Sequence, residues 1–269
     1  MSAVTTPVTT LLCDADGTLF PSEEPAFDAS VLVTNALLGK VGVRERLTAE
    51  QLRLTTTGKN FRTTAVDLLV AHGVPVEAAL VGERAGAVTT PRDGWIFSAE
   101  DLDEWVREEA AVVTGHLGQV LRPDPAVTNP LAALSSRFRL AAVSSSATAR
   151  LKACFRATGL GGLIPPEVRF SAEDSLPAPR SKPDPAVYTF ACERLGVPPA
   201  ECRAVEDSVP GARSAVLAGV PTVGLLQFVP PAERASRRGD LLAAGVETVL
   251  ESWAGVEQLL RSERWAVGA

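Results

Sequence analysis

Histidine and closely spaced cysteine, the usual ligands of zinc, are scarce in this sequence of 269 residues. Only two histidines occur, His72 and His116, and no two of the four cysteines have the CxxC spacing. A zinc site needs clustered thiolate or imidazole groups, so none is expected. The cysteines should be reduced and mostly buried; they are Cys13, Cys154, Cys192 and Cys202.

An excess of basic residues is also missing. The 26 Lys and Arg residues are outnumbered by 32 Asp and Glu, which gives a formal net charge of −6. This balance argues against a broad surface for nucleic acid or anionic membrane, although it permits a local site for an anionic substrate.

Long apolar runs and targeting signals are absent from the sequence as well. Residues 1–10 contain no basic residue and no apolar run, which argues against a signal peptide. The least polar long stretch, 215–232, is interrupted by glycine and proline, so it predicts a helix end, a turn and a buried strand. We therefore expect a soluble, cytoplasmic protein with no membrane partner.

Short apolar runs separated by helical sequence are the clearest pattern that is present. Four such runs occur, and they are Val8–Cys13, Phe138–Val143, Cys202–Val205 and Pro221–Leu226. Runs of this kind predict an α/β fold with a Rossmann-like parallel sheet covered on both faces. Ligands on such sheets bind beyond the carboxyl ends of the strands. The polar residues that follow the first three runs, near positions 14, 144 and 206, should therefore meet at one edge.

About a hundred residues separate the first two runs, and their pattern is helical. Helices are expected at Ala26–Leu38, Phe61–His72 and Ala99–Leu121, the last with Ser98 as N-cap. Prolines near both ends of the insertion block helix continuation. We interpret residues 22–122 as an inserted α-helical cap domain and residues 1–21 and 123–269 as a discontinuous core. A surface helix is expected at Ser252–Val267.

The segment Asp14-Ala15-Asp16-Gly17-Thr18-Leu19-Phe20 directly follows the first apolar run. Two carboxylates two residues apart at a strand end could point into one cleft. One of them could attack phosphorus while the second transfers protons. The alternative is a solvated Asp-x-Asp-Gly turn or half of a calcium loop, but the remaining positions of an EF-hand loop are not present at the required spacing.

This segment resembles motif I of the haloacid dehalogenase superfamily, and three further motifs follow in the expected order. Ala142-Val143-Ser144-Ser145-Ser146 resembles motif II, and Arg180-Ser181-Lys182-Pro183-Asp184-Pro185 resembles motif III. Val205-Glu206-Asp207-Ser208, followed by Gly211, resembles motif IV. The resemblance covers the core from about Thr9 to Gln227, and the position of the insertion is similar to that of a type C1 cap.

The resemblance implies a role for each of these residues. Asp14 would be the nucleophile and a ligand of Mg²⁺, with Glu206, Asp207 and the backbone carbonyl of Asp16 completing the metal site. Asp16 would act as acid and base, which favours phosphoryl transfer over dehalogenation because a halide leaves without protonation. Lys182 would balance the charges of the nucleophile and of the transferring phosphoryl group, and together with Ser144 and the Ser145 N–H it would bind phosphate. Taken singly, the Glu-Asp pair is more typical of a helix cap and the serine run of a turn. Lys182 alone is more typical of a solvated loop.

The cap offers a weaker signal at Thr57-Gly58-Lys59-Asn60-Phe61-Arg62. In the family the cap selects the substrate, so Gly58, Lys59 and Arg62 are candidate substrate contacts. An ordinary loop followed by an exposed first helical turn remains the alternative. Pro21 also departs from the commoner family pattern, which has an acidic residue before Ser-Glu.

The leading functional prediction is Mg²⁺-dependent hydrolysis of a small phosphate monoester, with a sugar phosphate as one candidate, through an aspartyl-phosphate on Asp14. A phosphomutase similar to β-phosphoglucomutase would use the same residues. A non-catalytic phosphate-binding or phospho-acceptor domain is a third reading, disfavoured by the cap insertion and by Asp16. The expected partner is a small phosphorylated metabolite, with no role for nucleic acid.

Overall fold

The computed structural model describes residues 7–56 and 60–262. In this part of the chain six strands form one parallel sheet in the order β3-β2-β1-β4-β5-β6. The strands are β1 (Thr10–Cys13), β2 (Arg139–Ser144), β3 (Arg169–Ser171), β4 (Cys202–Glu206), β5 (Thr222–Leu225) and β6 (Thr248–Leu250). The predicted α/β class with a Rossmann-like parallel sheet is confirmed.

The central strands are buried along their whole length, which explains why their sequences are apolar runs. All four residues of β1 and all five of β4 are buried. The two strands that the sequence did not predict, β3 and β6, are the edges of the sheet and have three residues each. Segments so short carry too few residues to show a period.

Helices connect the strands and form the second unit. The α-helices are α1 (Glu23–Lys40), α2 (Ala49–Thr56), α3 (Phe61–Ala71), α4 (Ala78–Val81), α5 (Ala99–Val120), α6 (Pro125–Ser135), α7 (Thr148–Thr158), α8 (Ala186–Leu195), α9 (Val209–Leu217), α10 (Arg234–Ala243) and α11 (Trp253–Arg261). Short 3-10 helices are η1 (Leu160–Gly162), η2 (Pro166–Val168) and η3 (Pro199–Glu201). The region predicted as one C-terminal helix thus forms α11, and its end beyond 262 lies outside the described residues.

Several helix starts follow from local sequence. Ser98 and Asp101 form a reciprocal capping box at α5, since each side chain accepts a hydrogen bond from the other's backbone N–H. Asp124 caps α6 ahead of a proline at its first position. Ser208 and Ser252 are the N-caps of α9 and α11, and each side chain accepts a hydrogen bond from a backbone N–H in the first turn of its helix. These caps place each helix directly after the strand or loop that precedes it.

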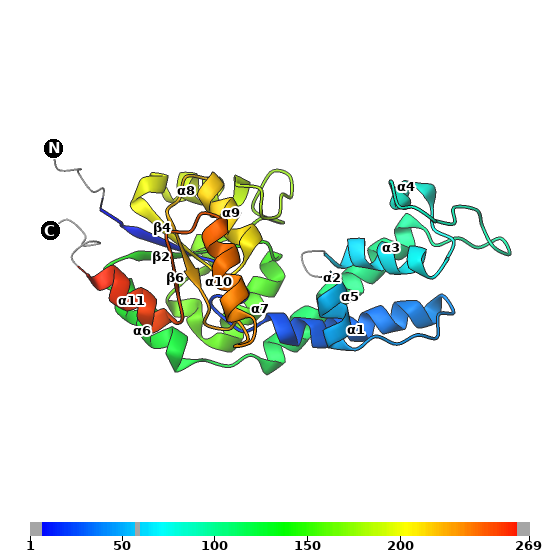
Figure 1. Ribbon diagram of the computed structural model, residues 1–269, viewed down its shortest axis with the longest axis horizontal. Helices are drawn as coiled ribbons and strands as arrows, with labels where there is room; N and C mark the ends of the chain where they lie inside the picture. The colour runs from blue at the N-terminus through cyan, green and yellow to red at the C-terminus, as the bar shows by residue number, and fades with distance from the viewer. Residues whose placement is uncertain (1–6, 57–59, 263–269) are drawn as a thin grey trace. The chain divides into compact units, whose positions relative to one another are not determined.

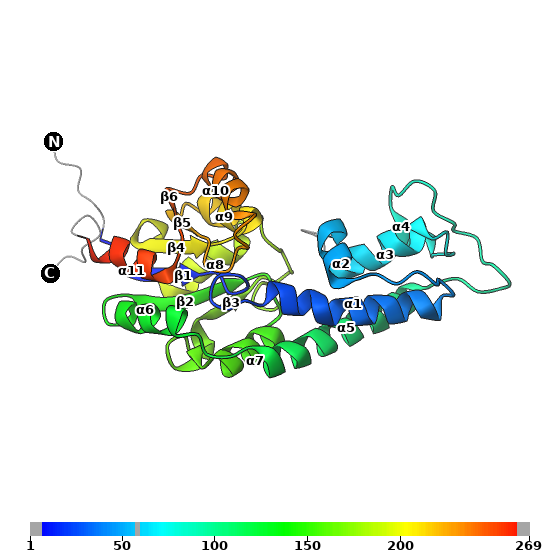
Figure 2. The same cartoon turned by 60° about the horizontal axis from the view of Figure 1, so that its bottom comes forward.

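The sheet lies between two layers of helices in the core (Figures 1 and 2). Helices α8 and α9 contact the central strands on one face, and α6 packs against α11 on the other. All four cysteines are free and buried, as expected. No helix among residues 7–56 and 60–262 has the length and apolar character needed to cross a membrane.

The chain divides into two compact units, Met1–Ser22 with Gly118–Ala269 and Glu23–Leu117. The second unit has its own apolar core, in which Leu37 of α1, Leu69 of α3 and Leu102 of α5 are buried together. It also contains isolated β-bridges, such as Arg92 with Trp95, that its sequence did not indicate. The second unit is therefore mainly helical and has a core separate from that of the sheet.

Trp253 joins the start of α11 to the loop after β1. Its side chain is completely buried, and Nε1 donates to the carbonyl of Thr18 at 2.8 Å. A buried indole normally satisfies its N–H in this way. The contact spans 235 positions of sequence and closes the core unit around the carboxyl edge of the sheet.

We expect Trp253→Phe to destabilise the protein by about 2–4 kcal/mol, because the smaller ring leaves a cavity in the core and a buried carbonyl loses its donor. Urea unfolding followed by circular dichroism measures the effect. Trp95→Phe is the matched control: Trp95 is 45% exposed, so its loss should cost less than about 0.5 kcal/mol. Equal effects of the two substitutions would contradict the role of the Trp253 hydrogen bond.

Candidate active site

The carboxyl ends of three neighbouring strands gather the polar residues of the core. Asp14 directly follows β1, Ser144 ends β2, and Glu206 ends β4 with Asp207 next in the chain. Strand β1 lies between β2 and β4, with Cys13 in register with Ala142 and Val205. The side chains after these strands consequently meet at one edge of the sheet.

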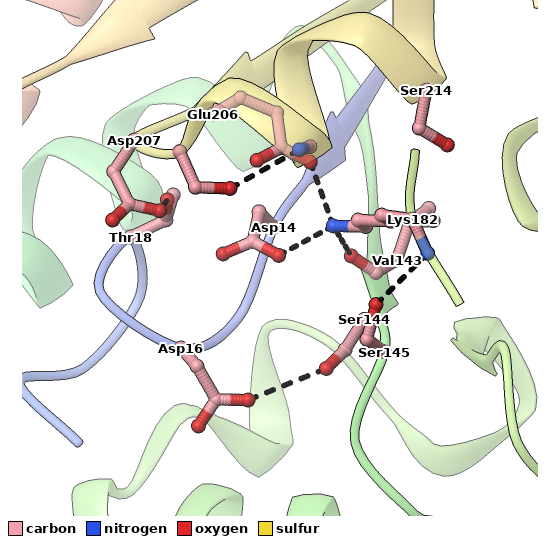
Figure 3. Close-up of polar contacts among 12 residues, drawn as sticks. Asp14, Asp16, Thr18, Val143, Ser144, Ser145, Lys182, Glu206, Asp207 and Ser214 are labelled. Atoms are coloured by element: carbon pink, nitrogen blue, oxygen red, sulfur yellow. Dashed lines mark hydrogen bonds and ion pairs between the residues drawn. The ribbon is translucent and has the colours of Figure 1, made fainter. Parts of the chain in front are cut away.

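Three carboxylates form the centre of this edge. Asp14, Glu206 and Asp207 each offer an oxygen within 4.8 Å of the others, and all three residues are buried (Figure 3). Glu206 Oε2 is buried without a hydrogen-bond partner among the described residues. Buried carboxylate oxygens in such a group repel one another unless a cation lies between them. The cluster therefore fits a divalent metal ion that prefers oxygen ligands.

The positively charged side chain of Lys182 lies beside two of these carboxylates. Its Nζ donates to Asp14 Oδ1 at 2.5 Å and to Glu206 Oε1 at 2.6 Å. A third hydrogen bond goes to the carbonyl of Val143 at 2.8 Å. All three donor positions of the ammonium are thus used, and the side chain is almost completely buried. Lys182 fixes the position of Asp14 against Glu206.

Burial and charge act on the pKa values of these groups in opposite directions. Burial raises the pKa of Asp14 although the adjacent Lys182 opposes the rise. Burial also raises the pKa of Glu206, to about 7, against the same lysine. For Lys182 burial lowers the pKa, but the charges of Asp14 and Glu206 outweigh it and the pKa is raised. The ammonium of Lys182 therefore stays charged. Without a further cation, the pKa of Glu206 stays close to neutral pH.

Two glycines leave the space that the carboxylates occupy. A Cβ at Gly211 would lie 1.9 Å from Glu206 Oε2, and a Cβ at Gly17 would lie 2.4 Å from Asp207 Oδ2. Gly17 also has a φ of +82°, which side chains rarely adopt. Both positions therefore favour glycine, because a carboxylate of the cluster lies against the backbone there.

Asp207 is held from several directions. The Thr18 hydroxyl donates to its Oδ1 at 3.0 Å, and the Thr18 carbonyl is the acceptor of Trp253. Arg237 of α10 donates to the Asp207 backbone carbonyl at 2.9 Å and lies 4.0 Å from Oδ2. These contacts orient the carboxylate toward Asp14 and Glu206.

Asp16 lies apart from the three-carboxylate cluster (Figure 3). Its Oδ1 accepts from Ser22 Oγ at 2.5 Å and from Arg150 Nη2 at 3.0 Å. Its Oδ2 accepts from Ser146 Oγ at 2.7 Å and from Ser144 Oγ at 3.4 Å. Burial raises the pKa of Asp16, but the Arg150 charge and the hydroxyl donors outweigh it, so this pKa is below its ordinary value.

Two of the three predicted phosphate-binding residues, Ser144 and Ser145, lie in the segment that contacts Asp16. Ser144 Oγ accepts from the Ser146 N–H at 2.9 Å, and Ser145 Oγ accepts from the Lys182 N–H at 3.3 Å. At the start of α7 the Thr148 N–H already donates to Asp174, at 2.5 Å. Of the three predicted phosphate contacts, the Ser144 hydroxyl is engaged within this network, and the roles of the Ser145 N–H and of Lys182 toward phosphate stay predictions.

The predicted cap contacts are largely untested. Gly58 and Lys59 lie outside the described residues. Arg62 is about half exposed at the start of α3 and pairs with Asp103 of α5. Its role in substrate binding stays a prediction.

Sequence reasoning missed several residues that contact the predicted site residues, and Tyr188 and Arg150 are two of them. The Tyr188 hydroxyl donates to Glu206 Oε1 at 2.5 Å, and Arg150 pairs with Asp16. Tyr188 lies on α8, six positions after Lys182, and Arg150 lies on the first turn of α7, six positions after Ser144. Their spacing from these motifs was the available signal, but without the helix orientation it did not identify the contacts.

Residues 8–219 match the model of a family described as haloacid dehalogenase-like hydrolases. The chain belongs to this family. The resemblance stated from its four motifs is confirmed, and so is its class as an enzyme.

Solved structures of similar fold extend over nearly the whole chain of this hydrolase. One is a HAD family hydrolase from Deinococcus radiodurans R1, 25% identical, with a TM-score of 0.61 and coverage of 97% of this chain and 99% of that one. Another is a predicted phosphoglycolate phosphatase from Haemophilus somnus, 21% identical, with a TM-score of 0.67 and coverage of 95% and 99%. A third is CbbY from Rhodobacter sphaeroides, 22% identical, with a TM-score of 0.61 and coverage of 92% and 95%.

A curated relative matches only a short segment of the hydrolase. It is a CBBY-like protein from Arabidopsis thaliana, 52% identical over 42 residues, which are 16% of this chain and 13% of the relative. This segment is too short to assign the activity of the whole relative to this chain.

We expect Gly211→Ala to weaken the binding of a divalent cation at least about 10-fold, because the new methyl group displaces the Glu206 carboxylate. Isothermal titration with Mg²⁺ or Mn²⁺ measures the affinity without any substrate. Gly239→Ala on α10 is the matched control, since a Cβ there meets nothing within 4 Å. Unchanged affinity in Gly211→Ala would remove Glu206 from the proposed metal site.

Proposed function

We propose that this hydrolase is a Mg²⁺-dependent phosphatase that hydrolyses a small phosphate monoester through an aspartyl-phosphate on Asp14. The observation that carries the proposal is the buried Asp14, fixed by Lys182 at 2.5 Å and grouped with Glu206 and Asp207. The structure from Deinococcus radiodurans is described with bound phosphate and sodium, and CbbY with xylulose-1,5-bisphosphate. Both descriptions support a phosphorylated substrate.

The residues around the cluster suit Mg²⁺. The ion would be held by Asp14, Glu206 and Asp207 together with the Asp16 backbone carbonyl. The buried Glu206 Oε2, which has no hydrogen-bond partner among the described residues, would gain a ligand bond to the ion. When bound, the ion would offset the repulsion between these carboxylates and the roughly two negative charges of a phosphate ester. A hard cation with oxygen ligands fits this donor set, whereas zinc would favour nitrogen and sulfur.

In the first step an Asp14 carboxylate oxygen attacks phosphorus and the bond to the ester oxygen breaks. Asp16, carrying a proton, gives it to that oxygen, so the products are an alcohol and the aspartyl-phosphate. Lys182 keeps Asp14 oriented and balances its charge. The serine segment Ser144–Ser145 would donate hydrogen bonds to the phosphate oxygens.

In the second step water attacks the same phosphorus, and Asp16 takes the proton of that water. The bond between phosphorus and Asp14 breaks, which releases inorganic phosphate and restores the carboxylate. The ionised Asp16 that its partners favour is the form needed here. Asp16 alternates between the two forms once in each turnover, so no proton is gained or lost by the site.

A phosphomutase would share the first step and then return the phosphoryl group to a second hydroxyl of the sugar. Release of inorganic phosphate from a sugar phosphate supports the hydrolase, and an accumulating isomer supports the mutase. A long-lived phosphoaspartate without turnover would instead indicate a phospho-acceptor domain.

The proposal predicts hydrolysis of p-nitrophenyl phosphate and of members of a sugar-phosphate panel that depends on Mg²⁺. Asp14→Asn should lower kcat at least about 10³-fold, because the amide is not a nucleophile. Asp240→Asn, an exposed aspartate of α10 whose side chain contacts Ser236, is the matched control and should retain full activity. Activity that survives in Asp14→Asn or in excess chelator would refute the proposal.

Asp16→Ala should lower kcat by about 10²- to 10⁴-fold while KM changes less than about twofold, because proton transfer is lost and phosphate binding is kept. Steady-state kinetics with an alkyl phosphate, whose leaving oxygen needs a proton, provide the measurement. A normal kcat in this variant would exclude Asp16 as the acid and base.

A further inference from the structure

Arg150 contacts the predicted acid and base but belongs to none of the four motifs. It lies on the first turn of α7, and its Nη2 donates to Asp16 Oδ1 at 3.0 Å. The two side chains are about three-quarters or more buried, at 26% and 20% exposed. An arginine–carboxylate pair with so little exposure is far less screened than one on the surface.

The contacts of Asp16 separate its two oxygens. Oδ1 is taken by Arg150 and Ser22, whereas Oδ2 accepts from Ser146 and Ser144 of the predicted phosphate segment. Pairing with Arg150 therefore fixes which carboxylate oxygen lies toward that segment. Figure 3 shows the carboxylate of Asp16 turned toward Ser144 and away from Lys182.

The hydroxyl donors alone do not fix this orientation. A hydroxyl rotates and also accepts hydrogen bonds, so serine can hold a carboxylate in several ways. A guanidinium is planar and only donates, and the Arg150 side chain is about three-quarters buried in contact with Asp16. Arg150 thus ties Asp16 to α7, which begins just after the phosphate segment.

We propose that Arg150 is a positioning residue, which acts on catalysis through the orientation of Asp16. The inference rests on the proposed phosphatase function. Arg150 itself touches neither the nucleophile nor its lysine among the contacts described. Its removal should change what Asp16 does and leave the binding of phosphate unaltered.

The test is a double-mutant cycle with p-nitrophenyl phosphate and an alkyl phosphate. Arg150→Met should lower kcat by about 5- to 100-fold with KM within about twofold, the range expected when a catalytic group is misplaced. In the Asp16→Asn background the same substitution should change kcat less than about twofold. Arg150→Lys should recover part of the activity, and Arg156→Met, an exposed arginine further along α7, should be silent.

Equal losses in both backgrounds, a raised KM with normal kcat, or no loss at all would overturn the proposal. Unfolding midpoints of the variants, with assays well below them, separate misplacement from loss of folded protein. An unmutated protein without phosphatase activity would refute the proposed function instead. In that case a crystal structure of Arg150→Met decides the placement: Asp16 should leave its contacts with Ser22 and Ser146, and an unmoved carboxylate would refute the role of Arg150.

Discussion

The burial of Lys182 against two carboxylates is the constraint on which the catalytic edge depends. Its ammonium donates to Asp14, to Glu206 and to the backbone of β2. The single Nζ atom therefore connects the ends of strands β1, β4 and β2. A buried charge left without its partner is strongly unfavourable. The loop that carries Lys182 must therefore return to the sheet for Asp14 and Glu206 to be buried together.

Residues beyond the family match, which ends at residue 219, also support the carboxylate cluster. Arg237 of α10 donates to the Asp207 carbonyl, and Trp253 of α11 donates to the carbonyl of Thr18, whose hydroxyl donates to Asp207. These two helices do more than cover the sheet. They hold a carboxylate that would otherwise turn away from two like charges.

Much of the core was predictable because its signals are local. The buried run before Asp14 and the acidic pair at the end of β4 each identify a strand end, and parallel topology brings such ends together. The edge strands β3 and β6 were missed because three residues show no period. Ordered motifs identified Lys182, but the ring of supporting side chains depends on how helices are rotated against the sheet. The contacts of Tyr188 and Arg150 could not be predicted from the sequence for that reason.

Asp14 and Asp16 illustrate how one short turn gives two carboxylates different chemistry. Asp14 lies among other carboxylates, and its burial raises its pKa although Lys182 is in contact. Asp16 is buried too, yet Arg150 and the hydroxyls of Ser22 and Ser146 bring its pKa below the ordinary value. Two aspartates separated by one alanine thus enter different networks, one built on the strand ends and the other on α7 and the serine segment. The two side chains are chemically identical, so the opposite directions of their pKa shifts follow from the partners that the fold gives to each carboxylate.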